Sequence, residues 1–526
     1  MSAPTTLRGL AEEVAERIGR PLDVDAVAAT VETLGVREVD ARERFGAPTV
    51  FVLAEWVEPI ARILARPAAE APPLPPFARA ALASARFIRF YGRGVFFALP
   101  MVVQVLTIAF LRLGSRFHLS DGQATAVMLG SIASFLVTGG FVQAIGRLGS
   151  VYVGRGNHVL ARRLTYRILG VGLLASVGLA LVLWPVGTVV GLVPQPELRV
   201  AIVYELVFSA LWLFLAVLYM LQQRTLVLAC VGVWVGVFAV LLAVAGTSVY
   251  VAQWGGAAAG ITTSALVGAW RLHLLVRETG AQRALEVLPP ARQVAREVAP
   301  YFWYGVLYFT LVFADRIVGW TKATPAHYAV YFHGPYELGL DWALLTMLLT
   351  VALLDHTINA FAVGLGPTQR RFAARDMRRH NRSLQLFYVR QVVLLAVLVA
   401  ISAAVLWLGG LWLRDAAGSL TEIRDFFSES VTYRVFIWAT LGYGLLVWGL
   451  LNAVFFFFVS RPAYALRPLV WGIGLGIAVG IGLSRTGIYW ESVIGLAVGA
   501  FVFAAGTTLY AIRLLDEIDY YAYASY

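Results

Sequence analysis

Apolar and polar positions alternate along this chain in long blocks. Between residues 93 and 513, apolar segments of about 20 residues follow one another with short polar breaks. A helix of about that length crosses a hydrocarbon core of roughly 30 Å. The pattern predicts twelve transmembrane helices, at about 94–113, 124–146, 166–190, 198–221, 225–247, 251–274, 298–320, 340–364, 386–410, 432–459, 464–483 and 488–512.

The loops between these segments divide them into two halves. A polar stretch separates the first six spans from the last six, and the second and eighth spans are each followed by an Arg-rich loop, Gly146–Tyr166 and Gly366–Phe387. Two lobes of six helices are typical of transporters whose repeats rock about a site at the membrane midplane. The sequence therefore predicts an all-α integral membrane protein with two six-helix lobes.

The first 66 residues have the character of a water-soluble domain. They contain 8 Arg and 11 Asp or Glu, with apolar residues at helical spacing in Leu10–Ile18, Val24–Leu34 and Val50–Leu64. A proline-rich run and an amphipathic segment with Phe87, Phe90 and Tyr91 on its apolar side follow. The predicted domains are a cytosolic helical domain (1–66), a linker with a membrane-surface helix (67–92), an N-lobe (93–276), a cytosolic linker (277–297), a C-lobe (298–513) and a cytosolic tail (514–526).

Composition indicates a membrane protein, and the distribution of charge predicts its orientation in the membrane. Of the 526 residues 59% are hydrophobic and only 14% are charged, against about 25% in soluble proteins. With the N-terminus inside, the predicted cytosolic loops hold 18 Arg or Lys residues and the opposite loops hold 8. Because basic loops stay in the cytoplasm, we expect a multi-pass protein of the cytoplasmic membrane with both termini cytosolic. The net charge of +11 is then topological and does not indicate nucleic-acid binding.

The sequence offers few groups for catalysis or metal binding. The one cysteine, Cys230, and seven scattered histidines have no metal-ligand spacing, so we expect no metal and no cofactor. A Walker A motif is excluded because the one lysine, Lys322, stands in TKATP. We therefore predict that the chain is not an enzyme.

Charged residues inside the predicted spans are the best candidates for function, because a charge in hydrocarbon is costly unless it has a partner. Span seven carries adjacent Asp315 and Arg316, and a pairing of Arg316 with Glu337 or Asp341 is expected across the short loop. At 100° per residue, the polar residues of span eight fall within about 100° of one face of an unbroken helix. The candidate substrate or ion pathway comprises Asp315, Arg316, Glu337, Asp341, Asp355, His356 and Asn359. The alternative is a buried ion-pair network that only holds spans seven and eight together.

These residues also carry a family resemblance. FADRIVGW, followed by YELGLDWALLTMLLTVALLDHTINAF, resembles the inner-membrane transporter of the Pel exopolysaccharide system. That family belongs to the multidrug/oligosaccharidyl-lipid/polysaccharide flippase superfamily. The resemblance covers residues 300–360, and its motif residues are Asp315, Arg316, Trp320, Tyr336 and Glu337.

The resemblance implies a transporter that moves a polysaccharide or a lipid-linked saccharide across the membrane by alternating access. It also implies a cytosolic glycosyltransferase and other membrane proteins of an export complex as partners, besides the lipid bilayer. Two alternatives are a membrane scaffold of an envelope or polysaccharide assembly complex, and a membrane-embedded glycosyltransferase. The second would need its carboxylates in the loop Leu411–Val431, with Asp415, Glu422, Asp425 and Glu429.

The basic loops give a first testable prediction about orientation. In a Cys230→Ala background, an Arg375→Cys variant should react with an impermeant thiol reagent only after the membrane is made permeable. Labelling of that position from outside intact cells would reverse the orientation. Labelling of a cysteine placed at Arg199, in a predicted outer loop, serves as the positive control.

Overall fold

The fold is described from a computed structural model. The described residues are 6–65, 75, 77–78, 81–82, 84–92, 94–95, 119–278, 288–369, 377–416 and 427–518. Every regular element within these ranges is a helix. The first predicted span, 94–113, lies outside them apart from its first two residues.

Four helices at the N-terminus form a unit with its own hydrophobic core. Their bounds are α1 Leu7–Ile18, α2 Val24–Thr33, α3 Glu38–Phe45 and α4 Val50–Leu64. Side-chain oxygens of Thr6, Asp23 and Thr49 accept backbone N–H bonds at the starts of α1, α2 and α4, which satisfies free donors there. Three helices coincide with the predicted segments. The fourth, α3, has the sequence EVDARERF, which is too polar for an apolar periodicity to reveal.

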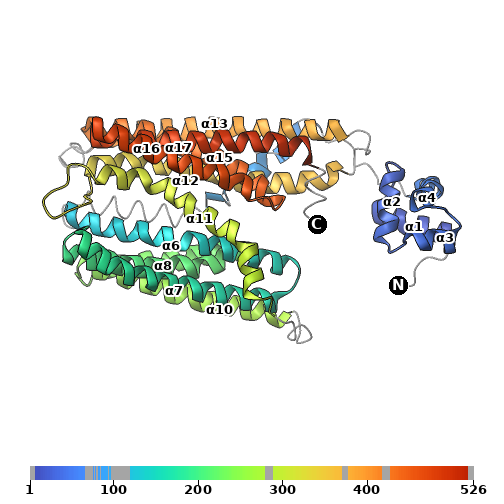
Figure 1. The fold of residues 1–526 in the computed structure, drawn as a ribbon, viewed down its shortest axis with the longest axis horizontal. Coiled ribbons are helices and arrows are strands. Elements are labelled where there is room, and N and C mark those ends of the chain that lie inside the picture. The colour runs from blue at the N-terminus through green and yellow to red at the C-terminus, as the bar shows by residue number, and fades with distance from the viewer. Residues whose placement is uncertain are drawn as a thin grey trace.

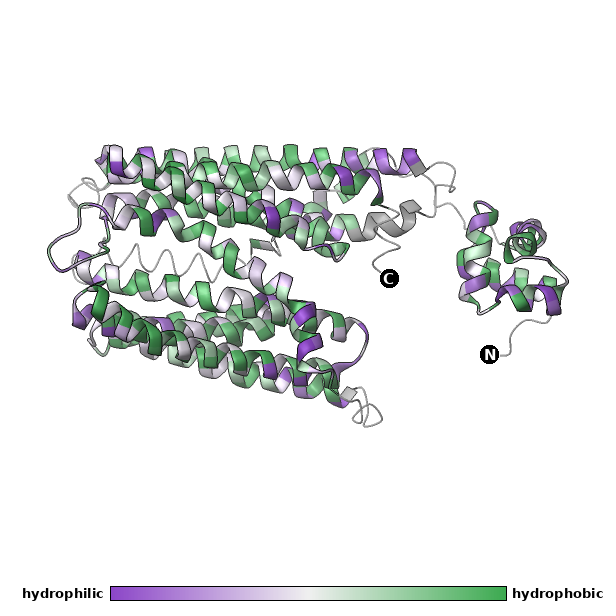
Figure 2. Cartoon of the chain, viewed as in Figure 1, coloured by the Kyte–Doolittle hydropathy of each residue, from purple (hydrophilic) through white to green (hydrophobic). Residues whose placement is uncertain are grey.

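The membrane body has eleven helices that are long and apolar enough to span a bilayer within the described part of the chain, so this is a multi-pass membrane protein. Each coincides with one predicted span, and Figure 2 shows hydrophobic residues along most of their length. They are α6 Asp121–Gly154, α7 His158–Val190, α8 Gln195–Met220, α9 Arg224–Ala243, α10 Val249–Glu278, α11 Ala291–Trp320, α12 Gly334–Gln369, α13 Met377–Ala416, α15 Ser430–Phe458, α16 Ala463–Thr486 and α17 Ser492–Asp516.

These helices form two lobes, with α6 to α10 in the N-lobe and α12 to α17 in the C-lobe (Figure 1). Helix α11 packs against α6 of the N-lobe and against α16 and α17 of the C-lobe, so it ties the lobes together. Gly139 of α6 and Gly305 of α11 face each other, and a Cβ on either would collide with the other backbone. We call the end of the body where α6 meets α7 the proximal end, and the end where α11 meets α12 the distal end.

Glycines also set the packing of the last two helices. Gly472, Gly476 and Gly480 recur every four residues on α16 and face Gly495 and Gly499 on α17. A Cβ at Gly476 would meet the carbonyl oxygen of Gly495, so small residues permit this close approach. The glycine stripe therefore serves helix packing.

Residues 84–92 form a helical segment that contacts the C-lobe. The Tyr91 hydroxyl donates to the carbonyl oxygen of Leu349 at 2.9 Å, and the Phe87 ring meets His356 edge-on with centroids 5.0 Å apart. The aromatic side that the sequence assigned to the membrane surface thus contacts α12. Periodicity alone identifies an apolar face without identifying what covers it.

Candidate functional site

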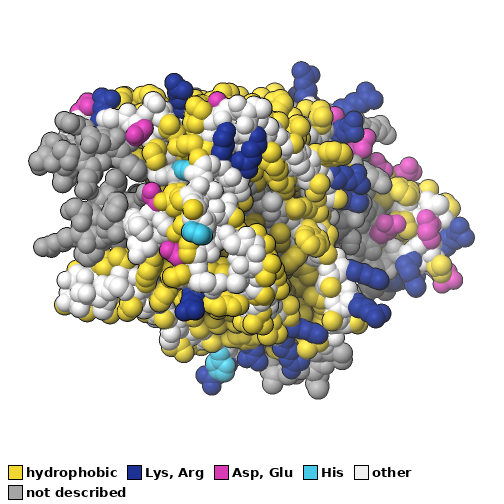
Figure 3. Space-filling view, turned by 60° about the vertical axis from the view of Figure 1, so that its left-hand side comes forward, with side chains coloured by type: hydrophobic (Ala, Val, Ile, Leu, Met, Phe, Trp, Pro, Cys, Tyr) yellow, Lys and Arg dark blue, Asp and Glu magenta, His cyan; other side chains and the backbone are white. Residues whose placement is uncertain are grey.

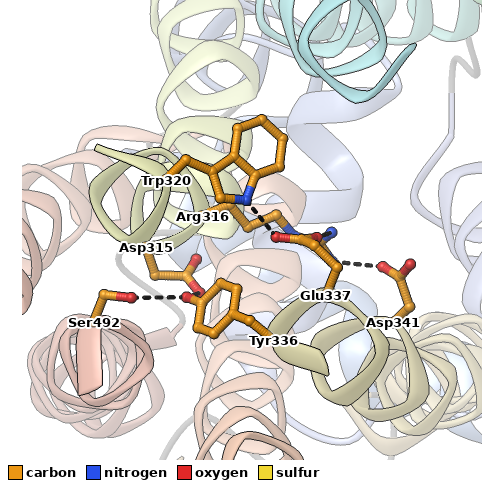
Figure 4. Close-up of polar contacts among 7 residues, drawn as sticks. All are labelled: Asp315, Arg316, Trp320, Tyr336, Glu337, Asp341 and Ser492. Atoms are coloured by element: carbon orange, nitrogen blue, oxygen red, sulfur yellow. Dashed lines mark hydrogen bonds and ion pairs between the residues drawn. The ribbon is translucent and has the colours of Figure 1, made fainter. Parts of the chain in front are cut away.

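A buried charge network joins α11 to α12 near the distal end of the C-lobe (Figure 4). Arg316, which has 0% exposure, forms an ion pair with Glu337 and a second with Asp341, where Nη2 lies 2.8 Å from Oδ1. The sequence predicted a pairing with one acid or the other, and Arg316 contacts both. Arg316 lies one turn before the end of α11, and the two acids lie in the first turns of α12, across a short connection.

The aromatic residues of the family motif are hydrogen-bond donors to these acids (Figure 4). Trp320 Nε1 donates to Glu337 Oε1 at 2.7 Å, and the Tyr336 hydroxyl donates to Asp315 Oδ2 at 2.9 Å. Ser492 of α17 donates in turn to the Tyr336 hydroxyl at 3.0 Å. Ser492 was beyond sequence reasoning, because it lies 156 residues from Tyr336 and stands in no motif.

The network contains more acids than bases. Asp315, Glu337 and Asp341 supply three carboxyl groups against the single Arg316 guanidinium, a formal charge of −2 if all are ionised. Asp315 Oδ1 is buried and accepts no hydrogen bond from the described residues. An uncompensated charge at such a site is costly, so the three acids depend on Arg316 as their cation.

The polar residues of α12 form two groups at different depths along the helix. Helix α12 is unbroken, so Asp341 and Asp355 lie about 21 Å apart along its axis. Asp355 pairs with Arg224 of α9 in the other lobe, with contacts of 3.2 and 3.3 Å. Asn359 donates to the Asp355 carbonyl oxygen at 2.7 Å, and His356 packs on Phe87. Arg224 is one of the 18 basic residues of the predicted cytosolic loops, and nothing near it in the sequence marks it as a partner of Asp355.

A cavity of about 260 Å³ lies between the lobes, midway between these two groups. Leu348 lines it from the same face of α12 as Asp341 and Asp355, about 10 Å from each along the axis. The other walls come from α6, α8 and α11, and are mainly aromatic and aliphatic. The lining residues are Phe135, Thr138, Gly139, Val142, Trp212, Tyr219, Tyr308, Phe309, Val312, Met347, Leu348 and Val351.

Polar contacts connect the two lobes on both sides of this cavity. On the distal side, the backbone N–H of Ala329 donates to Leu192 O at 3.0 Å, and that of Phe332 donates to Thr125 Oγ1 at 3.1 Å. On the proximal side are the Arg224–Asp355 pair and a 2.9 Å hydrogen bond from Arg147 of α6 to Ser460. The cavity therefore lies between two sets of contacts that join the lobes, one toward each end of the body.

Comparisons with known proteins identify the fold. Neither a protein-family model nor a curated protein sequence matches this chain. Solved structures of MATE transporters do match it. Among them are the eukaryotic AtDTX14 (TM-score 0.58, 16% identity, 84% of this chain and 99% of that one) and a MATE in complex with MaL6 (0.56, 14%, 82% and 97%). An inward-facing multidrug resistance MATE of the MOP superfamily also matches (0.54, 12%, 83% and 96%). At such low identity the likeness shows that the chain has the MATE-type fold, and it gives no support to a Pel-specific identity.

The Arg316 network leads to a stability prediction. Arg316→Met should destabilise the protein by about 3–5 kcal/mol, because it leaves Glu337 and Asp341 buried without their cation. Adding Glu337→Gln should recover part of that loss, since one unpaired acid is then removed. Melting temperature and the yield of monodisperse protein in detergent measure both effects.

A matched control is Arg414→Met, which removes a more exposed arginine, 36% exposed and paired with Asp415. Its effect on the melting temperature should be small beside that of Arg316→Met, as for surface pairs. A wild-type melting temperature for Arg316→Met would contradict a stabilising role for the network.

Proposed function

We propose that this chain is a transporter that moves a lipid-linked saccharide across the cytoplasmic membrane by alternating access between its two lobes. The observation that carries the proposal is the cavity between the lobes, with separable contacts on either side. A fold shared with solved MATE transporters supports transport as the activity.

The cavity lining favours an amphipathic cargo. Phe135, Trp212, Tyr308 and Phe309 present aromatic rings, and the remaining lining is mostly aliphatic. Aromatic rings pack on the apolar faces of ligands. An extended free polysaccharide would need a longer path rich in hydrogen-bonding groups, so we favour a saccharide attached to a lipid. The local resemblance to Pel transporters supports the saccharide part of this cargo.

The partners follow from the proposed cargo. A cytosolic glycosyltransferase would build the saccharide, and other membrane proteins of an export complex would receive it. The four-helix unit of residues 6–65 has its own core and a largely charged exterior, which suits recruitment of a cytosolic partner. Recruitment by residues 6–65 requires the N-terminus to lie in the cytosol, as the basic loops predict.

A membrane scaffold remains the second candidate function. The buried network around Arg316 favours it in one respect, because such networks join helices whether or not anything is transported. The two functions separate experimentally, since a scaffold has no transport activity when it is purified alone.

The first test measures transport in proteoliposomes with a fluorescent lipid-linked oligosaccharide and an impermeant quencher. Wild-type protein should move the probe, and Trp212→Leu and Phe309→Leu should each slow it about fivefold or more, since an aromatic contact contributes roughly 1 kcal/mol. Trp412→Leu, at an indole 67% exposed on the outside of the body, should transport normally. Absence of transport by folded wild-type protein would favour the scaffold.

A second test addresses alternating access. In a Cys230→Ala background, cysteines replacing Arg224 and Asp355 should be bridged by a short bifunctional thiol reagent. The bridge should stop transport, and a reductant should restore it, because the proximal side could no longer open. The control pair, Asn381→Cys with Asp516→Cys, lies within one lobe, where Asn381 donates to Asp516 O at 2.6 Å. Undiminished transport by the bridged Arg224–Asp355 variant would contradict opening at this contact.

A further inference from the structure

A second hollow lies on the flank of the N-lobe, away from the central cavity. It is a groove of about 410 Å³ between α7 and α11, and α6 forms its floor through Phe141 and Ala144. Ile168 on one wall and Val294 on the other pack onto the floor cluster of Ala144, Leu148 and Val298. Ten of the eleven lining residues are apolar, and the exception is Arg167. The groove can therefore hold a hydrocarbon chain such as a lipid acyl chain.

The groove lies toward the proximal end, where the helices reach the membrane boundary. Helix α7 has 33 residues and is about 50 Å long, roughly 20 Å longer than a hydrocarbon core. Arg167 is nine residues from the first residue of α7, about 14 Å along its axis. Its guanidinium can thus reach the headgroup region while the rest of the groove stays in the hydrocarbon.

Three exposed arginines lie on α7 and α11 toward the proximal end of the groove, and one of them, Arg167, lines it. Arg163 precedes Arg167 by one turn of α7, and Arg292 precedes the lining residues Ala295 and Ala299 by one and two turns of α11. None of the three arginines forms an ion pair or a hydrogen bond with another described residue, so all remain available to a ligand. Figure 3 shows that basic side chains gather toward one end of an otherwise largely hydrophobic flank.

We propose that this groove binds an anionic phospholipid of the adjacent leaflet, with an acyl chain along the apolar walls and the phosphate among Arg163, Arg167 and Arg292. The acyl chain matches the apolar walls, and the phosphate matches the arginines. A soluble anion would leave the apolar groove empty, and a lipid without a net negative charge would leave the arginines without a counter-ion. Basic pockets between membrane helices bind anionic headgroups by the same electrostatics. The site is separate from the central cavity, so it does not depend on the proposed cargo.

The bound lipid would fill the groove between α7 of the N-lobe and α11, the helix that joins the two lobes. Helices α7 and α11 both pack on α6, and the lipid would fill the space that separates their outer faces. It would stabilise the packing of α11 against the N-lobe, and anionic lipid should therefore raise the melting temperature of the whole protein.

The experiment uses full-length protein in nanodiscs of phosphatidylcholine alone or with phosphatidylglycerol. Phosphatidylglycerol should raise the melting temperature of wild-type protein and be retained by it in native mass spectra. The triple variant Arg163→Gln, Arg167→Gln, Arg292→Gln should lose the rise, with retention reduced about fivefold for each arginine. Glycerol 3-phosphate, a headgroup without acyl chains, should have no effect.

Two further variants complete the test. Ala295→Phe fills the groove but keeps every arginine, and it should also abolish the phosphatidylglycerol effect. Arg379→Gln removes an exposed arginine at the proximal end of α13, outside the groove, and should leave the effect intact. The site is overturned if the triple variant keeps the wild-type phosphatidylglycerol response, or if Arg379→Gln loses as much of it as the triple variant does.

Discussion

The absence of water in the hydrocarbon core is the constraint on which the rest of this structure depends. Every charge inside a span must find its partner in the protein, and the side chain of Arg316 does so with two acids of the next helix. The same constraint acts in the N-lobe, where Glu205 is fully buried and accepts hydrogen bonds from Ser176 at 2.8 Å and Ser209 at 3.0 Å. Polar partners, rather than apolar contacts, thus decide how particular helices are oriented toward one another.

The excess of acid around Arg316 gives this network a second property. Three carboxyl groups share one guanidinium, so the network does not divide into neutral pairs, and any change in its charge acts on Arg316. The ends of α11 and α12 meet there, and α11 also contacts the N-lobe. A change of charge at the network is therefore mechanically connected to the helix that joins the lobes.

The sequence predicts what depends on local pattern and misses what depends on distant segments. The spans follow from apolar runs, and the Arg316 pairs follow from charges on either side of one short loop. By contrast, Arg224 meets Asp355 across 131 residues, and Ser492 meets Tyr336 across 156. The cavity needs four helices to be placed before any of its walls can be recognised. Helix α3 escapes prediction for a different reason, because it has almost no apolar face.

The two ends of the polar stripe differ in how easily they can separate. Arg316 and Glu337 are at most 1% exposed, so pulling them apart would leave buried charges without partners. Arg224 and Asp355 are 19% and 20% exposed, so water can replace each partner as the contact opens. Helices α11 and α12 should therefore move together at their distal ends, whereas the Arg224–Asp355 contact can open at little cost as the lobes move. Because Leu348 lies between the two groups on the same face, opening that contact would widen the path from the cavity to the proximal end.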